Sequence, residues 1–243
     1  MVIAMRMGQY APMFPRTALV TGGASGIGVA IVELLREEGA EVQPLDLANW
    51  FDVSDAQAWD TVGAVDLACL NAGVTTGEHD VSRLSDSAYR RILGANLDGV
   101  VFGVRRLADV MEPGSAIVVT ASLAGLVPSP ADPIYTLTKH AVIGFVRSVA
   151  PQLEERGLRI NAVAPGFVET PLIDAAPFIA ADFPLLQPRA VAQAVLGAAR
   201  SSATGQVWVV QPGREPLEFR FPNVPGPRDA SGASVGAPPR PSS

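Results

Sequence analysis

Tyr135 and Lys139 stand four residues apart at the end of a stretch, 122–139, that Ser122 opens. If the residues from about Ile134 onward are helical, both side chains lie on one face, one turn apart. A close cation favours a phenolate, so such a pair can move a proton near neutral pH. Free tyrosine titrates near 10, so work at pH 7 to 8 requires a preference for phenolate of about 3 to 4 kcal/mol. Because this spacing also arises by chance in many helices, the elements around the pair decide its meaning.

The composition predicts a single α/β domain with a large core, since 48% of the 243 residues are hydrophobic. A net charge of −6 without a cluster of Lys and Arg argues against nucleic acid as a partner. Cys69 is the only cysteine, which excludes a disulfide framework and favours the cytoplasm. His79 and His140 lack partners at metal-ligand spacing, so we expect no metal.

The chain ends differ from its middle. No apolar run approaches the roughly 18 residues that span a membrane, and the apolar stretch in 1–15 is too short for a signal peptide. We therefore interpret 1–15 as a flexible lead-in. Residues 214–243 are rich in Pro, Gly and Ser, which predicts a disordered tail unless a neighbouring subunit holds it.

The sequence 16–46 has the layout of a dinucleotide-binding unit. A buried strand at 16–21 leads into the turn TGGASGIG at 21–28, a helix that Gly39 ends, and a second strand at 41–46. Glycines allow a tight turn and close approach of a pyrophosphate, and the following helix N-terminus offers free N–H groups and a positive dipole end. An ordinary glycine-rich turn between a strand and a helix is the alternative.

Asp46 ends the second strand, about twenty residues after the glycine turn. In a dinucleotide-binding unit this carboxylate accepts hydrogen bonds from the adenosine ribose and repels a 2′-phosphate. No Arg or Lys within the turn or directly after Asp46 would attract that phosphate. The sequence therefore predicts NAD rather than NADP, unless Asp46 is only a solvated residue at a strand end.

The rest of the chain continues the alternation of strands and helices. We expect strands at 65–70, 115–122, 158–165 and 206–210, and helices at about 54–62, 133–156 and 188–200. The run 82–111 holds two helices, whose glycines allow something to pack closely against the second. The whole predicts a Rossmann-type doubly wound sheet of about seven parallel strands with helices on both faces. Ser122 then emerges at the carboxyl end of a strand, where such sheets place their ligands.

Six motifs in register resemble the short-chain dehydrogenase/reductase family, in its TGxxxGxG and YxxxK branch, over about residues 16–213. They are the turn at 21–28, Asn71-Ala72-Gly73, Asn96 within NLDG, Ser122, the pair Tyr135 and Lys139, and Pro165-Gly166. Each motif alone is weak evidence for the family, but six motifs in the same order and spacing argue against a chance match.

The resemblance implies a catalytic role for four residues. Tyr135 would be the general acid/base, and Lys139 would lower its pKa and bind the nicotinamide ribose. Ser122 would polarise the substrate oxygen, and Asn96 would anchor a water in a proton relay behind Lys139. From the residues alone, Ser122 could be a turn hydroxyl, Asn96 a polar helix residue bonding backbone, and Asn71 a capping residue.

The resemblance also implies the cofactor contacts, from the pyrophosphate to the nicotinamide. Besides Tyr135 and Lys139 they are Gly22, Ser25, Ile27, Gly28, Asp46, Leu47, Asp52, Val53, Asn71, Ala72, Gly73, Pro165, Gly166, Val168 and Thr170. Thr170 lies in a loop whose length varies within the family.

The segment at about 167–187 would form the substrate lid and is shorter than in many members of the family. Its apolar residues predict an apolar substrate body, or else pack on the core: Leu172, Ile173, Phe178, Ile179, Phe183, Leu185 and Leu186. We expect PSPADP, at 128–133, to line the pocket as well. The ending QPGREP departs from the family's Asp-Gly-Gly, which puts the usual C-terminal subunit contact in doubt.

The function that follows is an NAD(H)-dependent oxidoreductase that interconverts a secondary alcohol and a ketone. A catalytically idle NAD-binding sensor or scaffold is the alternative, but such a protein would be free to lose Ser122, Tyr135 or Lys139. A sugar-nucleotide epimerase is disfavoured, because its extra substrate domain is missing. The resemblance also implies a homo-oligomer, a tetramer or dimer, through helices near 92–111 and 133–156; a monomer in light scattering would overturn this.

Overall fold

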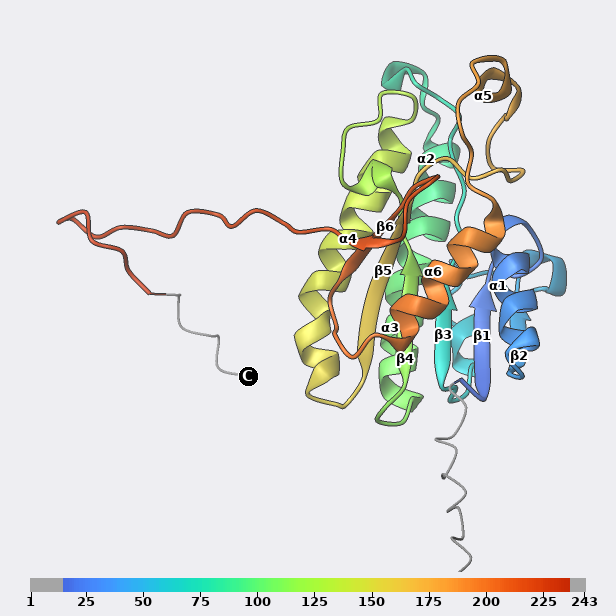
Figure 1. Cartoon of the computed structure of the whole chain (residues 1–243), viewed down its shortest axis with the longest axis horizontal. Helices are drawn as coiled ribbons and strands as arrows, with labels where there is room; N and C mark the ends of the chain where they lie inside the picture. The colour runs from blue at the N-terminus through green and yellow to red at the C-terminus, as the bar shows by residue number, and fades with distance from the viewer. Residues whose placement is uncertain (1–14, 237–243) are drawn as a thin grey trace, which may run out of the picture.

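Seven strands form the central sheet of the computed structural model, which describes residues 15–236 (Figure 1). Their spatial order is β2-β1-β3-β4-β5-β6-β7. The bounds are β1 Thr17–Thr21, β2 Glu41–Leu45, β3 Leu67–Leu70, β4 Ala116–Thr120, β5 Arg159–Pro165, β6 Val207–Val210 and β7 Leu217–Glu218. All six strands expected from the sequence are confirmed. The predicted doubly wound sheet of about seven strands is also confirmed, with one difference: β1 to β6 are parallel, whereas β7 runs antiparallel to β6.

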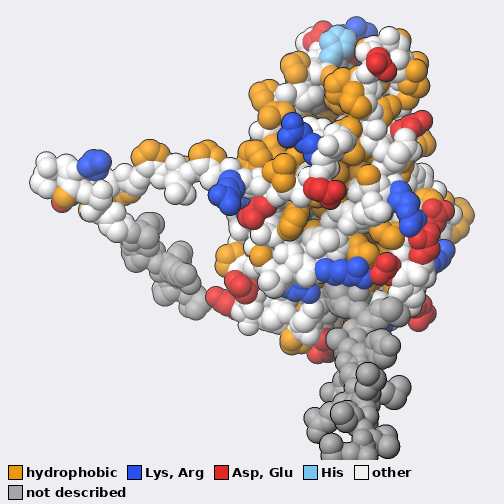
Figure 2. Space-filling model, viewed as in Figure 1, with side chains coloured by type: hydrophobic (Ala, Val, Ile, Leu, Met, Phe, Trp, Pro, Cys, Tyr) orange, Lys and Arg blue, Asp and Glu red, His pale blue; other side chains and the backbone are white. Residues whose placement is uncertain are grey.

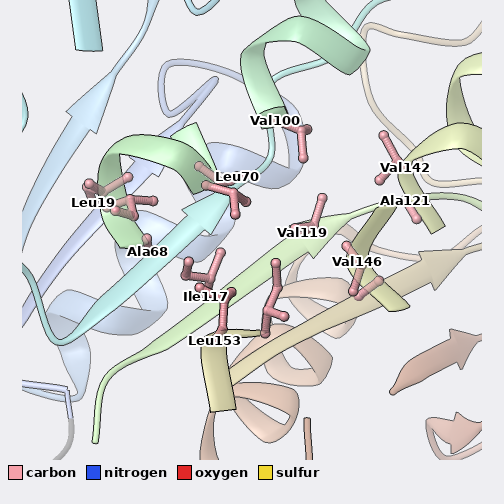
Figure 3. Close-up of a cluster of buried hydrophobic side chains, with 14 of the residues drawn as sticks. Leu19, Ala68, Leu70, Val100, Ile117, Val119, Ala121, Val142, Val146 and Leu153 are labelled. Carbon is pink, nitrogen blue, oxygen red and sulfur yellow. The ribbon is translucent and has the colours of Figure 1, made fainter. Parts of the chain in front are cut away.

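Helices cover both faces of this sheet, as predicted. Their bounds are α1 Gly26–Glu37, α2 Asp86–Leu93, α3 Gly99–Val110, α4 Pro133–Glu154, α5 Ala176–Ala180 and α6 Pro188–Arg200. Successive strand residues point to opposite faces, so Val20 packs in the cluster with α1 and α6, and Leu19 in the cluster with α3 and α4. Figure 3 shows the second cluster, in which Ile117 and Val119 of β4 meet Val146 of α4. Burial on both faces explains the apolar runs of the central strands β3 and β4, whereas the edge strand β2 includes exposed polar residues.

The strand order reverses next to β1. The chain leaves β1 through α1 to reach β2 on one side and later returns with β3 on the other side. The carboxyl ends of β1 and β3 therefore border the crevice where doubly wound sheets bind their ligands. The glycine turn, Asn71 and Ser122 follow β1, β3 and β4 and thus share this edge.

The segment between β2 and β3 differs from the prediction. The helix expected over about 54–62 is wrong: only a 3₁₀ turn, Ala58–Thr61, is present there. Carboxylates of Asp52 and Asp55 accept from backbone N–H groups two residues on, which competes with helix formation. The Trp59 indole also donates to the Val53 carbonyl at 2.9 Å. The chain is thereby folded back on itself, which a continuous helix would prevent.

Glycines bring this segment close to the run of helices that begins at α2. That run holds two helices as predicted, joined by a π-helical segment, Gly94–Asp98. A Cβ on Gly99 would lie 2.8 Å from the Val53 side chain, and one on Gly103 would lie 2.7 Å from the Trp59 ring. Close packing against the second helix is thus confirmed, and its partner is the segment that would face the adenine.

The C-terminal segment begins as part of the domain. Phe219 N–H donates to the Val207 carbonyl at 2.8 Å, and the Arg147 guanidinium lies 3.6 Å from the Phe221 ring centroid. The domain therefore continues past the predicted boundary at 213. From 222 to 236 the chain runs away from the domain, exposed along most of its length (Figure 1). Most of the predicted lead-in and the last part of the tail, at 1–14 and 237–243, lie outside the described residues.

Candidate active site

Tyr135 and Lys139 lie in the first two turns of α4, on one face as predicted. Asp132 caps this helix and Pro133 occupies its first turn, which fixes where the helix begins. Lys139 Nζ lies 5.5 Å from the centroid of the Tyr135 ring and donates to the Thr120 carbonyl at 2.9 Å. The lysine is 4% exposed. The strand end of β4 thus holds the ammonium in place beside the phenol.

Lys139 is the only lysine among the 18 Lys and Arg residues of the chain. Arginine stays protonated in proteins, whereas a buried lysine changes its pKa readily. Burial lowers the pKa of Lys139 to about 8. The one side-chain amine that can titrate near neutral pH therefore lies at the predicted site.

We expect Lys139→Met to unfold at higher urea concentration than the parent chain at pH 7. Below pH 8 the lysine is protonated in both folded and unfolded chains, so the full burial cost acts. A pKa lowered from 10.5 to about 8 corresponds to about 3 kcal/mol, offset by about 1 kcal/mol for the lost hydrogen bond to Thr120. Between pH 8 and 10.5 the folded chain releases the proton first, so the stability difference between variant and parent shrinks.

Urea unfolding of both proteins at pH 7 and pH 9.5 measures this difference. Comparison with the parent chain cancels the titration of other groups, such as Cys69, whose burial raises its pKa to about 12. If the free energies of unfolding of the variant and the parent differ by the same amount at both pH values, burial does not disfavour the charged form of Lys139.

Tyr135 is in its protonated form in the protein alone. The ring is partly exposed, but the phenol lies deep enough for desolvation to raise its pKa above 10. A hydrogen bond with Ser122 acts in the opposite direction, and the charge of Asp132 raises the pKa further. Lys139, which the resemblance expects to lower the phenol pKa, is not among the groups that set this balance, and its ammonium donates to the Thr120 carbonyl. A protonated phenol is the form that donates a proton to a carbonyl oxygen.

Ser122 is brought to Tyr135 by the end of β4. Its hydroxyl accepts from Ala124 N–H at 3.1 Å, capping the 3₁₀ turn Leu123–Gly125, and it lies close enough to the Tyr135 phenol to lower the pKa of that phenol. The turn interpretation of this residue is confirmed, and the turn bond orients the hydroxyl, while its role toward a substrate oxygen stays a prediction. Serine and tyrosine converge on one place, as a single substrate oxygen requires.

Asn96 is fully buried in the π-helical segment. Its side chain accepts from Val74 N–H at 2.8 Å and donates to the Val74 carbonyl and to Thr138 on α4. A Cβ on Gly73 would lie 3.3 Å from Asn96 Oδ1 and 3.5 Å from Lys139 Nζ. The side chain thus performs the backbone-bonding role, next to the lysine. π-Helical segments are frequent at functional sites.

Threonine hydroxyls connect the strand ends, and sequence reasoning did not identify them as site residues. Thr21 Oγ1 accepts from the N–H groups of Asn71 and Ala72, at 2.9 and 3.0 Å. Thr120 Oγ1 donates to Asn71 Oδ1 at 3.1 Å. The available signal was that threonine is the last residue of both buried strands, β1 and β4.

The glycine turn has the shape that a dinucleotide pyrophosphate requires. Gly22 has a φ of 65°, and a Cβ on Gly28 would lie 1.9 Å from the Gly22 carbonyl oxygen. Within the described part of the chain, Ser25 makes no side-chain cap on α1 and no acidic residue stands in its first turn. The N–H groups there can bind an anion. The shape of the turn is compatible with the predicted pyrophosphate contacts of Gly22, Ser25, Ile27 and Gly28, which stay predictions.

The predicted adenosine contacts lie beside this turn. Asp46 accepts from Ala24 N–H at 3.1 Å through one carboxylate oxygen and from Ala48 N–H at 3.0 Å through the other. The carboxylate is therefore next to the glycine turn, where a ribose would lie, and also caps the 3₁₀ turn Leu47–Asn49. Leu47 is 70% exposed. Asp52 and Val53 lie in the segment packed on the glycines near α3.

The predicted nicotinamide contacts come from the end of β5. Pro165 ends that strand, and a Cβ on Gly166 would lie 3.5 Å from the Leu123 side chain, next to Ser122. Val168 pairs with Leu186 at the base of the lid. A Cβ on Gly26 would lie 3.2 Å from the Thr170 side chain. Thr170 is therefore brought to the first turn of α1, across the crevice from its own strand.

An aromatic cluster organises the lid. Ring centroids of Phe167 and Phe178 are 4.6 Å apart, and Phe183 lies 5.9 and 5.8 Å from the two. Phe183 is 48% and Ile179 69% exposed, and Figure 2 shows hydrophobic side chains on the surface at the end of the molecule that carries α5. Only Leu186, of the lid residues predicted to meet substrate, is buried.

Residues 15–236 carry neither a candidate metal site nor a candidate membrane-spanning helix. This part of the chain contains no group of three or more His, Cys, Asp or Glu that could hold a metal ion. None of its helices is long and apolar enough to cross a membrane.

The comparison with known proteins covers most of the chain. Residues 43–213 match the family model described as enoyl-(acyl carrier protein) reductase. Cyclohexanol dehydrogenase of Acinetobacter sp. (strain SE19) is 32% identical over 235 residues, covering 80% of this chain and 93% of the relative. The cis-4-hydroxycyclohexanecarboxylate dehydrogenase of Sinomonas cyclohexanicum is 33% identical over 226 residues, covering 78% of this chain and 91% of the relative.

Solved structures also match this chain over most of its length. A 3-oxoacyl-[acyl-carrier protein] reductase with bound NAD from Brucella melitensis has a TM-score of 0.72 and 29% identity, covering 85% of this chain and 96% of that one. ElxO with NADP bound, at 22% identity and a TM-score of 0.69, covers 80% of this chain and 96% of its own and shares the fold. The chain belongs to the short-chain dehydrogenase/reductase family of NAD(P)-dependent oxidoreductases.

Proposed function

We propose that this protein is an NAD(H)-dependent oxidoreductase that interconverts a secondary alcohol and a ketone on an apolar small molecule. The observation that carries the proposal is the convergence of Ser122 and Lys139 on Tyr135 at the carboxyl edge of the sheet. An idle NAD-binding module would not need to keep its single lysine buried beside that phenol.

In this proposal Tyr135 and Ser122 act on one substrate oxygen. The Ser122 hydroxyl holds that oxygen, and the Tyr135 phenol gives it a proton in reduction or takes the proton in oxidation. NAD, when bound, supplies or accepts the hydride. Lys139 places a positive charge beside the phenol and binds the cofactor ribose, and Asn96 anchors a water behind it. The neutral Tyr135 phenol can donate a proton to the carbonyl oxygen in reduction at pH 7. Oxidation requires the phenolate instead, which the positive charge of Lys139 beside the phenol favours.

NAD is proposed over NADP because of Asp46. Its carboxylate is fixed next to the glycine turn by Ala24 and Ala48 N–H groups, so its charge faces the place of the ribose. A 2′-phosphate there would meet a negative charge without a compensating cation from the turn itself.

The substrate class is inferred from the lid and the relatives. Phe167, Phe178 and Phe183 form an apolar cluster above the strand ends, and related proteins are named for cyclohexanol, cis-4-hydroxycyclohexanecarboxylate and 3beta-hydroxysteroids. We therefore propose an alicyclic secondary alcohol or the corresponding ketone.

A panel of alcohols followed at 340 nm with NAD and with NADP tests this function. We expect kcat/KM for cyclohexanol or a 3β-hydroxysteroid to exceed kcat/KM for a charged acyl-CoA substrate. We also expect kcat/KM with NAD to exceed kcat/KM with NADP by at least about tenfold, which corresponds to about 1.4 kcal/mol of repulsion at Asp46. Asp46→Asn, which keeps a capping oxygen without the charge, should narrow the ratio between cofactors. Turnover with NADP alone would contradict the cofactor assignment, and turnover of charged substrates alone would contradict the substrate class.

A further inference from the structure

Asp132 is a buried carboxylate, 8% exposed, that sits between two parts of the active site. One oxygen accepts from the backbone N–H of Tyr135 at 2.9 Å and caps α4. The other accepts from Thr76 N–H at 2.7 Å and from Gly77 N–H at 3.2 Å. A single side chain thus joins the first turn of the catalytic helix to the loop that follows β3.

That loop is anchored at two points on opposite sides. Asn96 binds both backbone groups of Val74, and Asp132 binds the N–H groups two and three residues later. Gly77 has a φ of 68°, a left-handed conformation that favours glycine. The loop directly continues Asn71-Ala72-Gly73, so its position is tied to the proposed cofactor contacts.

We propose that Asp132 is a positioning residue of the active site, because this one carboxylate fixes Tyr135 and the loop at 74–77 relative to each other. The proposal rests on the proposed function only in giving Tyr135 the role of acid/base. Asp132 acts through the backbone groups that it binds, which belong to Tyr135, Thr76 and Gly77.

The charge of Asp132 gives this role a measurable signature. Two charged groups of the described residues lie beside Tyr135. They are Lys139, whose Nζ lies 5.5 Å from the ring centroid, and Asp132. The Asp132 charge raises the pKa of Tyr135 in addition to the larger effect of burial, while Ser122 lowers it. Removing the charge should therefore make the phenol more acidic, which the loss of a purely structural cap would not do.

The test is the ultraviolet titration of Tyr135 at 295 nm in Asp132→Asn. The chain has three tyrosines, so the spectrum of each protein minus that of its Tyr135→Phe counterpart isolates this phenol. We expect the pKa of Tyr135 to fall, because the charge that helps to raise it is removed. Asparagine keeps one carbonyl oxygen for the Tyr135 N–H, which is a favourable helix cap. Asp132→Ser, with a hydroxyl cap and no charge, provides the same test if the asparagine variant folds poorly.

A second measurement addresses the loop. Amide hydrogen exchange of the peptide that covers Thr76 and Gly77 should become faster in Asp132→Ser, because both N–H groups lose their acceptor. Asp80→Asn is the matched control, since Asp80 caps an exposed 3₁₀ turn later in the same connection, Val81–Arg83, through a bond to Ser82 N–H. It should change neither the titration of Tyr135 nor exchange at Thr76.

An unchanged Tyr135 titration in both Asp132 variants, with unchanged exchange of the loop, would overturn the proposal. Neither measurement needs turnover. If Tyr135→Phe in the otherwise unchanged chain retains full turnover, the proposed function fails, while titration and exchange still decide the role of Asp132.

Discussion

Tyr135→Phe should lower kcat by about 10²- to 10⁴-fold while NADH binds within about twofold of the parent chain. The substitution removes one oxygen from a partly exposed ring, so the helix and its packing stay intact. What is lost is the group that exchanges a proton with the substrate oxygen, and general acid–base catalysis contributes factors of this size. Steady-state rates at 340 nm and fluorescence titration with NADH measure the two quantities.

Tyr89→Phe is the matched control for this prediction. Tyr89 lies on α2 and is 39% exposed, so the same loss of a hydroxyl should leave kcat unchanged. Turnover retained by Tyr135→Phe would refute the assignment of Tyr135 as the acid/base, whatever the control shows.

Gly28→Ala should weaken NADH binding by at least about tenfold and destabilise the fold by about 1 to 3 kcal/mol. The added Cβ would lie 1.9 Å from the Gly22 carbonyl oxygen and 3.0 Å from the Asn71 side chain. Backbone atoms cannot yield as a flexible side chain can, so the turn has to open. Opening the turn moves the N–H groups that would bind the pyrophosphate. Fluorescence titration and urea unfolding give the two effects.

Gly197→Ala provides the control. Gly197 is exposed in the middle of α6, and a Cβ there meets nothing within 4 Å. The substitution should therefore stabilise the helix by up to about 1 kcal/mol and leave NADH binding unchanged. Equal binding by Gly28→Ala and the parent chain would contradict the position assigned to the pyrophosphate.

The regular elements were predictable because local patterns specify them. The strands β1, β3, β4 and β6 are apolar runs bounded by turn residues, and α4 and α6 have clear helical periods. The segment 54–62 was not predictable in the same way, because Trp59 bonds back to Val53 and packs against Gly103 of a later helix. That contact forms only when distant parts of the chain meet.

In the candidate active site, too, some features follow from local patterns and others from contacts between distant residues. The positions of Tyr135, Lys139 and Ser122 could be predicted from spacing and strand ends. The roles of Asp132, Thr21 and Thr120 could not, because each depends on hydrogen bonds between residues about 50 apart in the chain. The pKa of Tyr135 also depends on burial and neighbouring charge, which spacing does not report. The Tyr-x-x-x-Lys pattern therefore identifies the phenol and the amine, whereas their pKa values depend on the tertiary structure.

The most direct measurement of the proposed activity follows the hydrogen on the carbinol carbon. Cyclohexanol deuterated at that carbon is incubated with NAD and the protein, and the nucleotide is analysed by mass spectrometry. If the protein transfers a hydride from a secondary alcohol, the NADH formed carries one deuterium, and Tyr135→Phe forms little of it. NADH without deuterium would contradict direct hydride transfer, and no NADH from any alicyclic alcohol would contradict the proposed activity.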